Sequence, residues 1–157
     1  MQYGNPVRIY TDDGHEYICL TIGLYERMFA AANDLSTFMI QGELCVPGIQ
    51  KNRLKLTKPV WYVFTIRENG KRVGLTRMLE ICEKLQLESV PIEEIGTDFP
   101  VKYPTVEDLL ERADGNYPKG GKKEGIVIRP TEPVYCELIS GALSMKVVSN
   151  KYLLKNE

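Results

Sequence analysis

The stretch Val60–Ile66, VWYVFTI, decides the fold of this chain. It consists of β-branched and aromatic residues, which predicts a buried β-strand. After Arg67 comes the sequence Glu68-Asn69-Gly70-Lys71, which is typical of a tight hairpin turn. A buried strand that runs into a hairpin favours an antiparallel sheet at the centre of the protein.

Other strands and helices are predicted on both sides of this stretch. The further strands are Val7–Tyr10 and Glu16–Leu20 (joined by an Asp-Gly turn), Thr37–Ile40, Gly125–Pro130 and Leu143–Val148. Helical spacing predicts helices at Leu24–Ala32, at Leu75–Leu87 and after Thr105, which forms a capping-box pattern with Asp108. The predicted fold class is therefore α+β: a mixed, mainly antiparallel sheet with about three helices, in a single domain over residues 1–157.

Composition excludes several classes of protein. The 157 residues suit one domain, and the net charge of -1 means that any nucleic-acid partner needs a local basic patch. The four cysteines contain no C-x-x-C pair, which argues against zinc and favours reduced thiols. No apolar run approaches the roughly 18 residues of a membrane span. We therefore expect a soluble, cytoplasmic protein without a membrane partner.

Three charged residues stand at or within predicted strands. Glu43 follows an apolar strand, Glu124 begins one, and Lys146 lies inside one. Two carboxylates and a lysine on one sheet suit a nucleoside triphosphate site, because lysine pairs with phosphate and carboxylates hold Mg²⁺ or a ribose hydroxyl. A structural interpretation stays open, since such side chains are often solvated edge residues, Phe64 suits a core, and His15 suits a solvent-facing turn.

Four segments, in order, resemble the nucleotidyltransferase motifs of ATP-dependent RNA ligases. They are Ile40–Arg53 for motif three, Trp61–Phe64 for the adenine-stacking strand, Glu124–Pro130 for motif four and Ser144–Lys155 for motif five. The wording of Gly48–Asn52 resembles RNA ligases more than DNA ligases or capping enzymes. This order suggests a domain of the covalent nucleotidyltransferase superfamily that carries motifs three to five.

The resemblance implies a role for each matching residue. Glu43 would bind the ribose of ATP, and Phe64 would stack on adenine. Glu124 would help to bind Mg²⁺ or Mn²⁺, and Lys146 would contact the α-phosphate, so that these two are the catalytic residues present. In this family a motif-one lysine becomes lysyl-AMP, AMP passes to an RNA 5′-phosphate, and a 3′-hydroxyl then displaces it. The implied partners are ATP and RNA ends, in a nicked duplex or a broken RNA under repair.

The chain departs from the family pattern at three places. It contains no Lys-x-Asp-Gly; Thr11–Gly14 ends in Asp-Gly but lacks the lysine. The family's Ser-Arg pair would fall at Leu20-Thr21, and a second motif-five lysine would fall at Val148. We therefore expect an RNA ligase domain that lacks an N-terminal segment and is inactive alone. The alternatives are a non-catalytic nucleotide- or RNA-binding remnant, which a partner completes, and another covalent nucleotidyltransferase.

Overall fold

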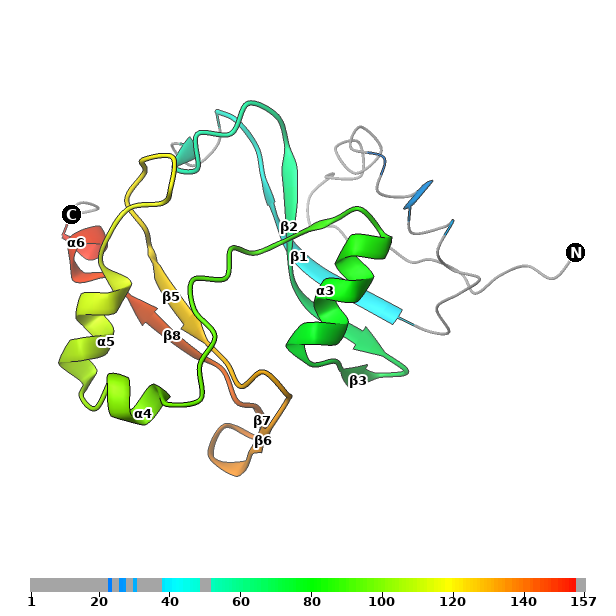
Figure 1. The fold of residues 1–157 in the computed structure, drawn as a ribbon. Helices are drawn as coiled ribbons and strands as arrows, with labels where there is room; N and C mark the ends of the chain where they lie inside the picture. The colour runs from blue at the N-terminus through cyan, green and yellow to red at the C-terminus, as the bar shows by residue number, and fades with distance from the viewer. Residues whose placement is uncertain (1–22, 24–25, 28–29, 31–37, 49–51, 155–157) are drawn as a thin grey trace, which may run out of the picture. The chain divides into compact units, whose positions relative to one another are not determined.

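The computed structural model describes residues 23, 26–27, 30, 38–48 and 52–154. Its fold is α+β with mainly antiparallel pairing, as predicted (Figure 1). The hairpin predicted at residues 7–20 lies outside the described residues, and so does most of the helix predicted at 24–32. The chain divides into two compact units, residues 1–46 with 58–90 and residues 47–57 with 91–157. The single domain over residues 1–157 stays a prediction.

The sheet of the first unit is built around the VWYVFTI stretch. The VWYVFTI stretch forms most of β2, Val60–Glu68. This strand pairs antiparallel with β1, Phe38–Cys45. β2 turns at Asn69-Gly70 into β3, Lys71–Arg72, and β4, Glu88–Ser89, pairs parallel with β2. The two turn residues have φ values of 50° and 77°, which this dipeptide tolerates. The predicted strand and hairpin are both confirmed.

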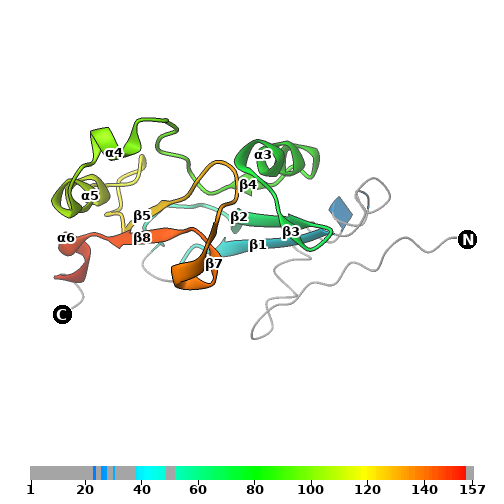
Figure 2. The same ribbon diagram turned by 90° about the horizontal axis from the view of Figure 1, so that it is seen from below.

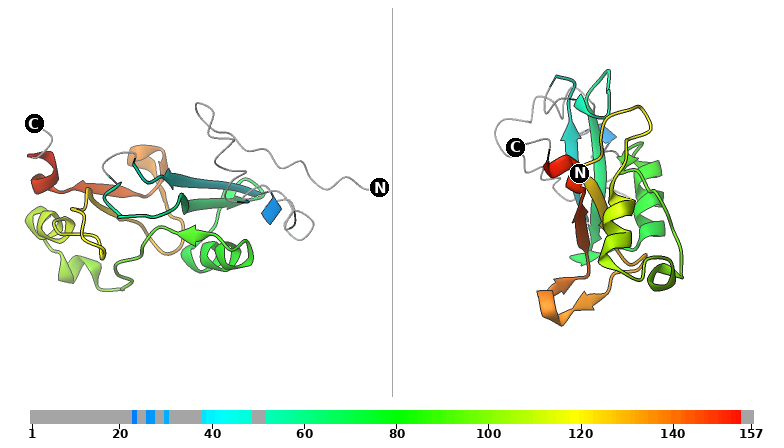
Figure 3. Two further views of the ribbon diagram at one scale, coloured as in Figure 1. Left: turned by 90° about the horizontal axis from the view of Figure 1, so that it is seen from above. Right: turned by 90° about the vertical axis from the view of Figure 1, so that its left-hand side faces the viewer.

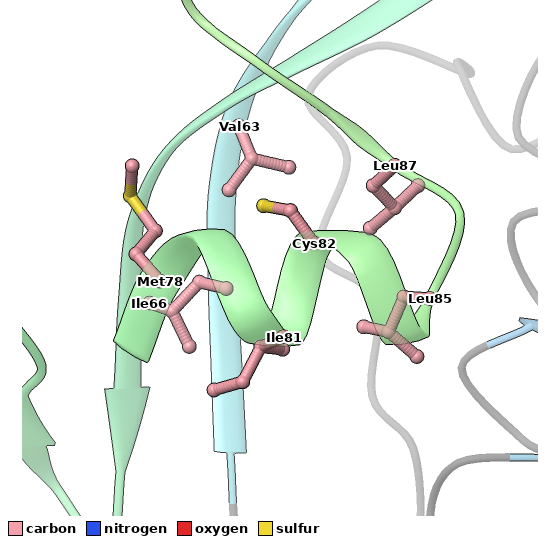
Figure 4. Close-up of a cluster of buried hydrophobic side chains, with 7 residues drawn as sticks. All are labelled: Val63, Ile66, Met78, Ile81, Cys82, Leu85 and Leu87. Atoms are coloured by element: carbon pink, nitrogen blue, oxygen red, sulfur yellow. The ribbon is translucent and has the colours of Figure 1, made fainter. Parts of the chain in front are cut away.

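Helix α3, Leu75–Lys84, covers one face of the β1–β2 pair (Figure 2). Its apolar side packs on β2 and forms the buried cluster shown in Figure 4: Val63, Ile66, Met78, Ile81, Cys82, Leu85 and Leu87. Burying such side chains is the main favourable contribution to folding. The core of the first unit therefore lies between α3 and this face of the sheet.

The second unit consists of short elements. They are α4 (Phe99–Lys102), α5 (Val106–Ala113), β5 (Gly125–Ile128), β6 (Tyr135–Cys136), the 3₁₀ helix η2 (Glu137–Ile139), β7 (Gly141–Ala142), β8 (Met145–Val148) and α6 (Asn150–Leu153). β5 pairs antiparallel with β8, and α5 packs against both (Figure 3). The predicted capping box of α5 is present, because Thr105 and Asp108 each bond to the backbone of the other. The β5–β8 pair carries the site residues of this unit.

Two general expectations concern the whole chain. Among the residues that the structure describes, no helix is long and apolar enough to cross a membrane. The three cysteines in the described part, Cys45, Cys82 and Cys136, are free.

Candidate functional site

Glu124 and Lys146 form an ion pair across the β5–β8 pair. Lys146 lies opposite Val127 in the antiparallel register, and Glu124 directly precedes β5. The Nζ of Lys146 is 2.5 Å from Oε1 of Glu124, and the two side chains are 56% and 45% exposed. The structure thus brings two of the four expected site residues together, with opposite charges at a surface that a ligand can reach.

The residue after Glu124 must be glycine. A Cβ at Gly125 would lie 2.0 Å from the carbonyl oxygen of Val147, which is far closer than real Cβ atoms approach an oxygen. The Ser149 N–H donates to the carbonyl of Glu124 at 2.8 Å and extends the pairing by one residue. This close approach of the two backbones fixes where the Glu124 side chain starts.

Lys123, the neighbour of Glu124, is buried in an ion-pair network. It is only 6% exposed, and its Nζ is 2.8 Å and 2.9 Å from the two carboxylate oxygens of Glu93. Arg112 of α5 also pairs with Glu93, at 2.5 Å. Burial raises the pKa of the Glu93 carboxyl, but the hydrogen bonds and charges of Lys123 and Arg112 outweigh it and hold that pKa below its usual value. Lys123 thus anchors the start of β5.

This network places one lysine of the basic run Lys119–Lys123 inside the protein. The loop is a tight turn in which Tyr117 N–H donates to the Gly121 carbonyl at 2.7 Å, and Lys123 lies inside the protein. The sequence gives one weak signal for this: a strand alternates its faces, so Lys123 and Glu124 should point to opposite sides. It gives no signal for Glu93 or Arg112.

A second set of contacts holds the segment after β8. Ser149 is 2% exposed, and its hydroxyl donates to the Asp114 carboxylate and accepts from the backbone N–H of Tyr152 at 3.2 Å. Lys151 pairs with Asp114 at 2.9 Å. The hydrogen bond from Ser149, and then that from Lys151, lower the pKa of Asp114. These contacts tie α6 to the end of α5.

Glu43 and Phe64 lie on the paired strands β1 and β2 of the first unit. Glu43 is exposed and faces Tyr62 across the pair. Ile40 packs against the core under α3, so alternation directs Glu43 to the other face of the sheet. Burial, and then the negative charge of Glu43, raise the pKa of the Cys45 thiol, which shares that face. Glu43 thus stands on the face that α3 leaves uncovered.

Phe64 lies at an irregularity in the strand pairing. Gln41 faces Thr65 while Gly42 faces Val63, so the strand register skips Phe64, as in a β-bulge. Bulges redirect side chains and occur often beside functional sites. The four expected site residues therefore form two sets, Glu43 with Phe64 in the first unit and Glu124 with Lys146 in the second.

The acidic residues limit how a metal could bind. In the described part of the chain, no group of three or more His, Cys, Asp or Glu side chains could form a metal cage. Mg²⁺ is commonly held by one or two carboxylates together with phosphate oxygens of a substrate. Glu124, exposed and next to a lysine that suits phosphate, fits a metal ion of this kind.

Comparison with known proteins identifies the family. The model of the RNA ligase family matches residues 8–148. This chain therefore belongs to the RNA ligase family. A search of curated proteins finds no match.

Solved structures of Naegleria gruberi RNA ligase share the fold. A mutant with ATP and Mn is 23% identical, with a TM-score of 0.70, and the match covers 95% of this chain and 42% of that one. The structure with PPi is 23% identical over 94% and 42%, with a TM-score of 0.68. Another mutant, with AMP and Mn, is 22% identical over 95% and 42%, also at 0.68. This chain thus spans less than half of the length of these ligases, and the likeness establishes the nucleotidyltransferase fold.

Proposed function

We propose that this chain is the part of an ATP-dependent RNA ligase catalytic domain that carries motifs three to five. In this proposal Glu43 binds the ribose of ATP and Phe64 stacks on adenine. Glu124 binds Mg²⁺ or Mn²⁺, and Lys146 contacts the α-phosphate. The observation that carries the proposal is the exposed ion pair of Glu124 and Lys146, in a chain of the RNA ligase family. The solved Naegleria ligases with ATP and Mn support the choice of ligands.

The ion pair suits a nucleotide that arrives with a metal ion. Such a ligand carries negative phosphate oxygens and a divalent cation side by side. When such a ligand binds, Lys146 can leave Glu124 and pair with phosphate, and Glu124 can pair with the cation. Each of the two side chains then still has a partner of opposite charge. The cation would supply charge neutralisation at the phosphates. Lys146 would stabilise the negative charge that develops on the α-phosphate as the bond to pyrophosphate breaks.

The overall reaction joins an RNA 3′-hydroxyl to an RNA 5′-phosphate. Lysyl-AMP forms first, with loss of pyrophosphate, and RNA-adenylate forms second. A lysine nucleophile needs a lowered pKa and alignment with the α-phosphate. No lysine of this chain stands in a Lys-x-Asp-Gly context, so we propose that the attacking lysine lies in a segment other than the one described here.

The second candidate is a non-catalytic nucleotide- or RNA-binding protein. The missing Lys-x-Asp-Gly motif favours it. The coding sequence upstream of Met1 distinguishes the two: an in-frame Lys-x-Asp-Gly supports the ligase, and a stop codon supports the remnant.

Calorimetric titration of ATP and adenosine tests the site. Phe64→Ala should weaken both ligands, because stacking on a base is worth ~1–3 kcal/mol. Lys146→Ala should weaken ATP about tenfold or more and leave adenosine unchanged, because hydrogen bonds to charged groups contribute roughly 1.5–3 kcal/mol. Lys71→Ala, on exposed β3, is the control for loss of a positive charge. Equal losses of ATP and adenosine in Lys146→Ala would refute the phosphate role.

A further inference from the structure

Two segments of the second unit, far apart in sequence, lie against each other. One is the turn at residues 52–56, and the other is the hairpin closed by the bridge between Asn116 and Lys122. A Cβ at Gly121 would lie 1.9 Å from the carbonyl oxygen of Arg53, so the two backbones touch there. Lys55 Nζ lies 3.2 Å from the position of a Cβ on Gly120. The basic residues Arg53 and Lys55 of the turn and Lys119 and Lys122 of the hairpin therefore stand on adjoining segments.

The turn at residues 52–56 is held by side-chain hydrogen bonds and contains strained backbone. The side-chain amide of Asn52 donates to the Leu56 carbonyl and its oxygen accepts from the Leu56 N–H, both at 2.9 Å. Asn52 and Lys55 have φ values of 42° and 49°, in the left-handed region. A lysine adopts that conformation at an energetic cost, and such strain is found most often where a side chain has a function. The turn ends at Lys55, whose N–H donates to the Asn52 carbonyl at 2.9 Å, and holds this lysine next to the hairpin.

The charge on this surface is not neutralised within the described chain. Lys102, Lys123, Lys146 and Lys151 each have a carboxylate partner. None of Arg53, Lys55, Lys119 and Lys122 has a carboxylate partner within 4.0 Å among the described residues. The Arg53 guanidinium instead lies 4.2 Å above the Tyr152 ring. In a chain of net charge -1, four such cations form a concentrated positive patch.

We propose that this patch, formed by Arg53, Lys55, Lys119 and Lys122, binds the phosphodiester backbone of the RNA strand that is joined. The inference rests on the proposed ligase function and adds the surface that holds the polymer. Lys122 lies two residues before Glu124, so the patch and the Glu124–Lys146 pair belong to the same compact unit. Lysine ammonium groups bind phosphates as point charges, and the planar guanidinium of arginine matches phosphate oxygens with two hydrogen bonds. Such a patch recognises the negative charge of the RNA backbone and does not distinguish base sequences.

The test compares two triple variants of the whole chain with equal loss of charge. K55Q/K119Q/K122Q removes three cations of the patch, and R67Q/K71Q/K84Q removes three cations of the first unit. Fluorescence anisotropy follows binding of a short, labelled, 5′-phosphorylated single-stranded RNA over a series of salt concentrations, without ATP. The patch variant should bind about tenfold more weakly, and its slope of log affinity against log salt should fall by roughly two, since each lost phosphate contact on a single strand removes about 0.7.

Several outcomes would overturn the inference. The first is an unchanged RNA affinity and salt slope in the patch variant, and the second is an equal loss of RNA affinity in the control variant. The third is that the unaltered chain does not bind RNA. The fourth is that the chain binds labelled polyglutamate more tightly than RNA, which would indicate an acidic polypeptide partner. If the triple variant does not fold, K119Q alone, at an exposed position of the hairpin, should still lower the slope. Calorimetry with ATP separates the two proposals. A patch variant that keeps ATP affinity and loses RNA affinity supports the patch, while an unaltered chain that binds RNA but not ATP contradicts only the nucleotide site.

Discussion

The Nζ atom of Lys146 lies 2.5 Å from Oε1 of Glu124, and this contact joins a residue within β8 to the residue that precedes β5. Both side chains are about half exposed, and exposed ion pairs contribute little to stability. The pair therefore contributes little to folding, and the role that we propose for it is in ligand binding. In the proposed site, each of the two side chains takes the position that a ligand group of the same charge would occupy.

Glu124→Gln should change ATP binding in opposite directions with and without a divalent cation. Without the cation, loss of the competing carboxylate should tighten ATP binding roughly three- to tenfold, because Lys146 can then bond fully to phosphate. With Mg²⁺ or Mn²⁺, loss of the carboxylate ligand should weaken binding by at least a similar factor, about three- to tenfold. Calorimetry in chelator and in excess metal measures both.

The matched control is Glu107→Gln on α5, which removes an exposed carboxylate of the same unit. It should leave ATP affinity unchanged in both conditions, and both variants should keep their unfolding free energy within about 0.5 kcal/mol. A Glu124→Gln variant that weakens ATP equally with and without metal would show that Glu124 does not bind the cation.

This chain alone should not become labelled when it is incubated with α-labelled ATP and Mg²⁺. An attacking lysine needs the surroundings that lower its pKa, and no lysine here has the motif-one context. Denaturing gel electrophoresis with autoradiography measures the result. An acid-labile adenylate on the chain would show that one of its own lysines is the nucleophile.

Gly125→Ala should destabilise the protein by roughly 1–3 kcal/mol, because the added Cβ overlaps the Val147 carbonyl and forces β5 away from β8. Gly96→Ala is the control, since its Cβ would only approach the mobile end of the Asp98 side chain, at 3.1 Å. Chemical denaturation should give the unaltered chain and Gly96→Ala similar free energies of unfolding, and Gly125→Ala a lower one. If the two alanine variants were equally stable, the close strand approach would not constrain the site.

Glu93→Gln should destabilise the second unit and change how stability depends on pH. Removal of the negative charge leaves Lys123, which is 6% exposed, without its counter-charge, at a cost of about 1–3 kcal/mol. The pKa of Glu93 is lowered on folding, so its stabilisation is present above the ordinary value of 4.5 and is lost as the pH falls through the lower folded-state pKa.

Denaturant unfolding of both proteins at several pH values measures this effect. The stability difference between the unaltered chain and Glu93→Gln should be constant near neutral pH and should shrink below pH 4.5. Lys123→Met should cost less than Glu93→Gln, because a methionine of similar length fills the buried space without leaving a charge there. A difference that grew as the pH fell would contradict the assigned ion pair.

Much of the local structure could be predicted because short-range rules decide it. The VWYVFTI strand, the Asn-Gly turn after it and the capping box at Thr105 all formed as expected. Each depends on a few adjacent residues whose backbone preferences agree with the fold. The strand at the start of motif three is longer than predicted, because pairing with β2 continues past the apolar run to Cys45.

The end of α3 shows where such rules fail. The apolar pattern predicts a helix to Leu87, but α3 ends at Lys84. Gln86 takes a φ of 53°, and its N–H and that of Leu87 donate back to Glu83 and Cys82. This is the Schellman arrangement, in which the left-handed position is usually glycine. With glutamine there, the sequence shows no stop signal, and Leu87 stays in the core after the helix has ended.

The residue types of the candidate site follow from the motif resemblance, but the pairings of these residues do not. The motif resemblance selects Glu124 and Lys146, but only the β5–β8 register shows that their side chains meet. The sequence also does not show that Lys123 is buried while Lys122 is not, because the partner of Lys123 is Glu93, thirty residues away. Long-range pairs of this kind depend on the three-dimensional arrangement of segments that are individually unremarkable.

Residues 47–57 belong to the second unit, although the chain on both sides of them belongs to the first. A single cut therefore cannot separate the two units, and a fragment that begins at residue 91 lacks the Arg53 backbone against which Gly121 lies. Synthesis from the N-terminus also imposes an order. The ribosome completes the first unit at residue 90, while the turn at residues 52–56 still has no partner. That turn acquires its neighbour only when the hairpin at Gly121 has emerged.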